Sequence, residues 1–215
     1  MIESAHGIIL RTRPLTETSL IVHWFTPDLG RVATVAKGAR RPKSPFAGKL
    51  DLFYAGDFSF QRSRRSELHN LREVKLLETR RAIREDLNKL QQAAYLAACL
   101  EQATESETPM PELFELTRLF LDRLCRLAPL PQHILGWELK FLQELGMEPD
   151  LEETRLPPGT KKVVALLLAE DWSQDSPLVL SDAQTREISH WLHGFIIFHL
   201  GRLPHGRAGA VGHVG

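Results

Sequence analysis

Positive side chains that could bind phosphate are concentrated in one segment, Val35-Ala-Lys-Gly-Ala-Arg-Arg-Pro-Lys-Ser44. Four cations lie within seven positions of it: Lys37, Arg40, Arg41 and Lys43. Glycine and small neighbours allow ammonium and guanidinium groups to approach successive phosphates without steric obstruction. The segment therefore predicts contact with a nucleic-acid backbone. The alternative interpretation is a solvated surface loop.

A second basic cluster and several aromatic side chains lie in the same part of the chain. Arg62, Arg64 and Arg65 follow one another closely, and further cations are Arg11, Arg13, Arg31 and Lys49. Bases of single strands stack on aromatic rings in basic grooves, and the rings available here are Trp24, Phe46, Phe53 and Tyr54. We interpret Trp24 and Phe53 as core residues and expect Phe46, in the basic loop, to stack on a base. The predicted nucleic-acid-binding set is Arg11, Arg13, Arg31, Lys37, Arg40, Arg41, Lys43, Phe46, Lys49, Arg62, Arg64 and Arg65.

The net charge of zero hides an asymmetry between the two parts of the chain. Residues 1–80 hold 14 Lys and Arg against 8 Asp and Glu, and residues 81–215 hold 13 against 19. The first part is therefore basic, with a net charge of +6, and the second acidic, with a net charge of −6. Such a division favours a basic module that binds a polyanion.

The residues that would support covalent chemistry are missing or poorly arranged. The sequence has no Gly-x-x-x-x-Gly-Lys-Ser/Thr loop for nucleotide phosphates, and Cys99 and Cys125 both lie among helix-forming apolar residues. His190 and His193 are three apart on an expected helix, but no third ligand is evident. We therefore expect no enzyme activity, no cofactor and no metal. The absence of a signal peptide or an 18-residue apolar run predicts a cytoplasmic protein, which DNA binding would associate with the nucleoid.

The first 80 residues have the pattern of short strands. Apolar or alternating runs end at turn residues, and Gly56 lies inside a run, where it permits a barrel corner. The expected strands are the run around residues 8–10 and residues 19–26, 31–37, 51–61 and 67–78. The stretch 71–81 is ambiguous between strand and helix. Five such strands suit a small closed antiparallel barrel of the OB type.

From Arg81 the apolar spacing changes to three and four residues, which predicts helices. Residues 135–145 form an apolar arc broad enough for a central helix, and Gly146 is placed to end it. Thr160 and Ser181 are expected N-caps, and Trp191, Phe195 and Phe198 an apolar side of the last helix. The predicted fold class is α+β multi-domain: a barrel at 1–80, an all-α domain at 81–205 and a flexible glycine-rich tail at 206–215.

The opening GIILRTRPLTETSLIVHWFTPDLGRVATVAKGARRPKSPFAGKLDLF resembles the N-terminal domain of the bacterial recombination mediator family RecO. The matching elements are the Thr-x-x-x-Gly turn at Thr26–Gly30 and the Val-Ala-Lys-Gly-Ala-Arg motif at Val35–Arg40. LKFLQELGMEP, residues 139–149, and FHLGR, residues 198–202, resemble segments of the helical domain. The resemblance implies an OB-type barrel that binds single-stranded DNA, and duplex DNA more weakly. It also implies annealing of complementary strands in the RecF pathway of DNA damage repair.

The same resemblance implies partners. Family members act with RecR to load RecA onto DNA coated by single-strand-binding protein, and the helical domain receives the acidic C-terminal tail of the latter. An apolar notch beside cations would suit such a tail, and the expected residues are Arg118, Phe120, Arg123 and Arg126. The alternatives are an OB-fold module that binds RNA and a scaffold whose barrel binds only protein.

One departure from the family pattern is evident. Many relatives carry a four-cysteine zinc ribbon after the Leu-Gly-x-x-Pro segment, whereas residues 147–162 contain no cysteine. The sequence therefore predicts a member without a zinc ribbon.

Overall fold

The computed structural model describes residues 1–174 and 178–212, which form two compact units. Unit 1 comprises Met1–Arg80 together with Thr104–Glu115, and unit 2 comprises Arg81–Ala103 together with the chain from Leu116. The first segment of unit 1 thus ends at Arg80. The return of residues 104–115 to unit 1 has no counterpart in the domain organisation expected from the sequence.

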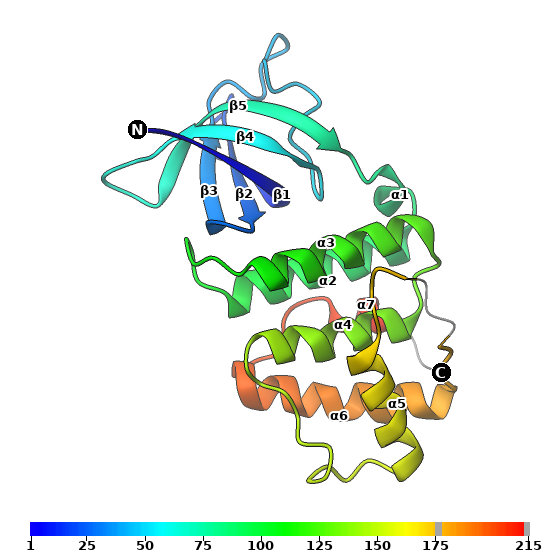
Figure 1. The fold of residues 1–215 in the computed structure, drawn as a ribbon. Helices are drawn as coiled ribbons and strands as arrows, with labels where there is room; N and C mark the ends of the chain where they lie inside the picture. Colours follow the sequence, from blue (N-terminus) through cyan, green and yellow to red (C-terminus); the bar gives the residue numbers. More distant parts are fainter. Residues whose placement is uncertain (175–177, 213–215) are drawn as a thin grey trace. The chain divides into compact units, whose positions relative to one another are not determined.

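Unit 1 is built on five strands that close into a barrel in the order β1-β2-β3-β5-β4 (Figure 1). The strands are β1 (Ile2–Pro14), β2 (Leu20–Thr26), β3 (Gly30–Ala36), β4 (Ala55–Gln61) and β5 (Leu68–Glu78). All neighbouring pairs are antiparallel except β3 and β5, which are parallel. This barrel is of the OB type, so the predicted fold class is confirmed. Within the ambiguous stretch 71–81, the residues up to Glu78 belong to strand β5 and not to a helix.

Apolar side chains that alternate along the strands fill the barrel interior. Trp24 stacks on Phe58 at a centroid distance of 4.1 Å, and Ile9, Val22 and Phe60 belong to the same cluster. The indole nitrogen of Trp24 donates to Thr34 Oγ1 at 2.9 Å, which satisfies the one polar atom of the ring. Trp24 and Phe53 are each 1% exposed, which confirms that both are core residues.

The bend expected at Gly56 is present. The register between β4 and β5 shifts between Ala55 and Gly56, and a Cβ at Gly56 would lie 2.5 Å from the carbonyl oxygen of Lys75. Only glycine allows the two backbones to approach this closely. The corner that closes the barrel therefore depends on this residue.

Unit 2 is helical. Its helices are α1 (Arg81–Arg84), α2 (Leu87–Ala103), most of α3 (Pro111–Arg126), α4 (Pro131–Glu144), α5 (Pro158–Ala169), α6 (Asp182–Leu200) and α7 (Arg207–Val211). Helix α4 contacts α5, α6 and α7 and is buried over most of its length, as its broad apolar arc predicts. Gly146 follows this helix with a φ of 72°, in the left-handed region that suits glycine.

The end of unit 2 differs from its prediction in three respects. Residues 207–211 form α7, in which Arg207 is only 5% exposed, instead of belonging to a flexible tail; residues 213–215 lie outside the described residues. Ser181 caps α6 with a complete capping box, as expected, whereas Thr160 lies inside α5, where Pro157 is the N-cap. Helix α6 buries Ile188, Leu192 and Ile196, and not the side marked by Phe198, which is 83% exposed.

Candidate nucleic-acid interface

Three of the predicted cations meet on the outer face of β1, β2 and β3. Arg11 pairs with His23 across β1 and β2, and Arg13 lies two residues further along β1 on the same side. His23 lies between core residues Val22 and Trp24 and so points outward. Arg31 of β3 is paired with Phe25, two residues from His23 on β2. The strand register thus assembles a small surface, here called the arginine face and defined by Arg11, Arg13, His23 and Arg31.

The charges of the arginine face act on its histidine. Burial is the first cause that lowers the pKa of His23, and the positive charges of Arg13, Arg11 and Arg31 lower it further. Its Nε2 atom is buried and has no hydrogen-bond partner among the described residues. The face therefore combines three cations with one neutral imidazole near neutral pH.

The basic loop after β3 is held beside this face. Arg40 donates from its backbone N–H to the carbonyl of Thr18 at 3.0 Å and from Nη1 to the carbonyl of Thr16 at 3.3 Å. These acceptors lie in the turn between β1 and β2, next to the end of the strand that carries Arg13. Lys37, Arg41 and Lys43 are exposed in the same loop. Two groups predicted separately from the sequence thus become neighbours.

Phe46 does not offer the stacking surface expected of it. Its side chain is 6% exposed and belongs to the barrel core with Trp24 and Phe58. The loop around it is polar and glycine-rich, so one inward aromatic ring fixes it to the barrel. The prediction that Phe46 stacks on a base is therefore wrong.

The predicted cation at Arg62 is engaged by two carboxylates. Arg62 forms a bidentate pair with Glu3, with N–O distances of 2.7 and 2.8 Å, and a further ion pair with Glu107. The Arg62 guanidinium lowers the pKa of Glu3, and Glu3 in turn raises the pKa of Arg62. Glu107 also accepts from Nε2 of the buried His69 at 2.6 Å. Arg62 therefore holds unit 1 together, while Arg64 and Arg65 are exposed beside it.

Two cations that the sequence interpretation left out join Lys49. Arg72 and Lys75 of β5 line a pocket of about 240 Å³ together with Lys49, Pro45 and Phe46. Glu73 also lines the pocket and offsets part of the positive charge. The charges of residues 72–75 are the sequence signal that could have identified these two cations. The signal is weak because the stretch is ambiguous between strand and helix, so its exposed side cannot be assigned from the sequence.

The residues expected to receive a protein tail do not form one surface. Phe120 is fully buried, and Arg123 is 1% exposed in an ion pair with Glu170 and 4.8 Å above the ring of Trp172. Arg118 pairs with Asp122 one turn along α3, and Arg126 is exposed. Arg123 and Phe120 therefore belong to the core of unit 2, which corrects the predicted notch.

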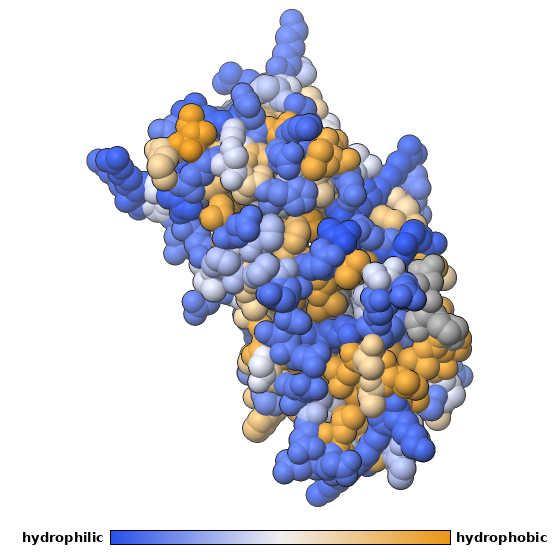
Figure 2. Space-filling view, in the orientation of Figure 1, coloured by the Kyte–Doolittle hydropathy of each residue, from blue (hydrophilic) through white to orange (hydrophobic). Residues whose placement is uncertain are grey.

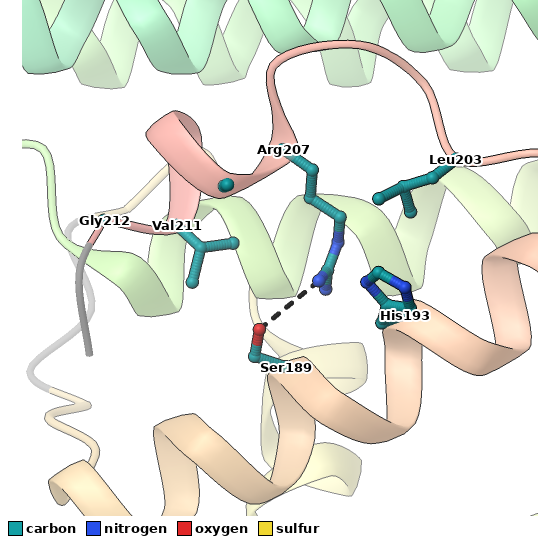
Figure 3. Close-up of a pocket in the computed structure, with 7 residues that line it drawn as sticks. Ser189, His193, Leu203, Arg207, Val211 and Gly212 are labelled. Atoms are coloured by element: carbon teal, nitrogen blue, oxygen red, sulfur yellow. Dashed lines mark hydrogen bonds between the residues drawn. The ribbon is translucent and has the colours of Figure 1, made fainter. Parts of the chain in front are cut away.

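A different pocket of unit 2 lies between α6 and α7. It has a volume of about 430 Å³ and is lined by Ser189, His193, Leu203 and Arg207, among others. Figure 3 shows Arg207 reaching from α7 toward Ser189 of α6. Both Glu138 oxygens also accept from Arg207, at 2.6 and 2.8 Å, so its charge is already compensated.

Neither a metal site nor a membrane-spanning helix is found in residues 1–174 and 178–212. No group of three or more His, Cys, Asp or Glu side chains there is arranged to hold a metal ion. No helix in these ranges has the length and apolarity needed to cross a membrane.

Figure 2 shows apolar side chains gathering over α5, where Leu166 is 56% exposed.

Comparison with known proteins divides the chain into a barrel part and a helical part. The family described as recombination protein O, N terminal, matches residues 1–80, and the corresponding C-terminal family matches residues 84–154. A DNA repair protein RecO from Bacillus pumilus is 33% identical over 153 residues, which cover 71% of this chain and 59% of that protein. Its counterpart from Bacillus cereus is 33% identical over 149 residues, 69% of this chain and 59% of that protein.

These curated relatives are thus matched over about three fifths of their own length. The two family matches together span most of the chain, and they follow each other in the order of the barrel and the helices. The chain therefore belongs to the RecO family.

Proposed function

We propose that this chain is a DNA repair and recombination protein that binds single-stranded DNA through unit 1 and makes or breaks no covalent bond. The observation that carries the proposal is the arginine face, where the register of a closed OB-type barrel brings Arg11, Arg13 and Arg31 together. The loop cations beside it extend the positive surface. Such a surface suits a flexible polyanion.

Annealing and recombinase loading are the activities that fit this binding. Two complementary strands repel each other through their phosphates, and a basic surface lowers that repulsion by displacing counterions. We propose that the chain anneals strands and helps to load RecA onto DNA coated by single-strand-binding protein. The proposed partners are RecR and the tail of that protein. Since Phe120 and Arg123 are buried, Arg118 and Arg126 are the members of the predicted set that remain on the surface for the tail.

The basic loop provides a direct test. Replacing Arg40, Arg41 and Lys43 by Gln should weaken binding to a single-stranded oligonucleotide. It should also reduce the slope of log affinity against log salt by about two, because each phosphate contact on a single strand contributes about 0.7. Fluorescence anisotropy over a salt titration measures both.

A matched control removes three cations from unit 2: Arg155, Lys161 and Lys162, all replaced by Gln. This variant has the same net charge as the loop variant, so it separates a specific surface from total charge. Equal slopes for the two variants would exclude the loop from the binding surface. Preference for RNA over DNA of the same sequence would favour the RNA-binding alternative.

A further inference from the structure

His23 is the one member of the arginine face that is not a permanent cation. Its side chain is half-buried on β2, and it faces Arg11 and Arg13 of β1 and Arg31 of β3. These three guanidinium groups are the charged groups that act on it. No carboxylate is among them, unlike His6, which pairs with Asp57, and His69, which pairs with Glu107.

The imidazole is also incompletely satisfied. Nε2 is closed off from solvent and has no hydrogen-bond partner among the described residues. In the free protein no group among the described residues favours the charged form of this ring, whereas a ligand with a negative charge would favour it. The surrounding cations exclude a second cation as that ligand. The chemistry of the face selects an anion, and under the function proposed above that anion is a backbone phosphate.

We propose that His23 takes up a proton when a backbone phosphate of single-stranded DNA docks among Arg11, Arg13 and Arg31, so that DNA binding is linked to proton binding. The inference rests on the DNA-binding function proposed above. A docked phosphate offsets the repulsion from the three arginines, and its negative charge favours the protonated form of the nearby imidazole. His23 thereby becomes a fourth cation that exists only in the complex.

The direction of the pH dependence follows from this linkage. Burial and the arginines lower the pKa of His23 in the free protein, and the phosphate raises it in the complex. Because the complex then holds more protons than the free protein, affinity rises as the pH falls through the pKa of the complex. Above that pKa both states are neutral at His23, and the contribution disappears. For each unit by which the phosphate raises the pKa, the affinity gain is limited to about tenfold.

The experiment uses a labelled oligonucleotide of thymidines at fixed ionic strength between about pH 5.5 and pH 8, the range in which histidine titrates. Thymine and the phosphodiester keep one protonation state there, so the pH dependence reports on the protein. Wild type should bind more tightly at acid pH. His23→Gln should lose the part of this dependence that belongs to the arginine face. The matched control, His6→Gln, removes another partly exposed histidine of the same barrel, which lies outside the arginine face, and should keep this dependence.

A second measurement does not depend on a variant. The His23 ring is titrated by NMR in the wild-type chain with and without the oligonucleotide, and its pKa should be higher in the complex. Equal pKa values in the two states, or an unchanged pH dependence in His23→Gln, would overturn the inference while leaving DNA binding intact. A chain that binds no oligonucleotide at any pH would instead contradict the proposed function, and the inference with it.

Discussion

Arginine has two different roles in this chain, and nearby carboxylates decide which one applies. Arg207 and Arg123 are buried and paired with Glu138 and Glu170, so their charges stabilise unit 2. Arg13 lies on an exposed strand face among other cations. Residue type alone does not separate the two roles, because the carboxylate partners of Arg123 and Arg207 are about 47 and 69 positions away in sequence.

The Glu138–Arg207 pair gives the prediction at the residue scale. Tyr95 also donates to Glu138 at 2.6 Å, and burial together with Glu138 raises the pKa of this tyrosine. Arg207→Met would leave a buried carboxylate without its cation, and we expect unfolding free energy to fall by about 3–5 kcal/mol. Denaturant unfolding measures this loss. The double variant with Glu138→Gln should recover part of it, and a double variant no more stable than the single one would contradict the electrostatic explanation.

At the scale of elements, glycine has opposite effects in the strand and in the helix. Gly56 permits the close approach of β4 and β5, whereas Gly194 lies in the middle of α6, where an added Cβ would have nothing within 4 Å. A helix-interior glycine lowers stability relative to alanine through its conformational entropy. The two residues therefore allow one substitution to be compared in two contexts.

We predict opposite signs for the two alanine substitutions. Gly56→Ala should lower the stability of unit 1 by about 1–3 kcal/mol, because its Cβ would collide with the backbone of Lys75. Gly194→Ala should raise the stability of unit 2 by about 0.5–1 kcal/mol. Thermal unfolding of both variants is the measurement. A Gly56→Ala chain as stable as wild type would show that the barrel corner can relax.

The sequence pattern predicts where helices and strands form, but it does not predict which side of each element is buried. Strand alternation, Gly56 and the Ser181 cap are local signals, and the structure has each of them. The apolar side expected of α6 is not the side that is buried, because Phe198 is as apolar as Ile188 and only the packing partners decide which of them is covered. The prediction for Phe46 is wrong for the same reason, since a ring in a basic loop can point either way.

At the scale of the whole molecule, the assignment of residues 104–115 changes the electrostatics. The net charge of +6 for residues 1–80 falls to +2 for unit 1 when the four glutamates of this segment are included. Thr104 accepts from Arg31, and Glu107 pairs with Arg62. The segment therefore engages two of the predicted DNA-binding residues, and at Arg62 its carboxylate offsets the positive charge.

Glu107→Gln should change the stability of the protein and its affinity for single-stranded DNA in opposite directions. Burial alone would raise the pKa of Glu107, but hydrogen bonds from His69 and Arg62 outweigh it and lower that pKa. The stabilising effect of Glu107 is therefore present above the unfolded pKa and lost as the pH falls through the folded one. We expect the variant to be less stable by about 1 kcal/mol near neutral pH, and to bind single-stranded DNA about two- to threefold more tightly because a nearby negative charge is removed.

Anisotropy and thermal unfolding check both parts. The control is Glu105→Gln, which removes the same charge from an exposed position of the same segment. A smaller gain in the control indicates that the contact with Arg62 matters, and weaker DNA binding by Glu107→Gln would contradict the argument.

The barrel, the helical unit and the basic character of the first 80 residues follow from local sequence pattern, because periodicity, turn residues and charge are properties of neighbours along the chain. Which cations share a surface follows from the fold. The strand register brings Arg11, Arg13, His23 and Arg31 together. Arg62, Arg123 and Arg207 instead form ion pairs with carboxylates distant in sequence. The physical reason is that an ion pair or a phosphate site depends on distances of a few ångströms, which only the folded backbone fixes.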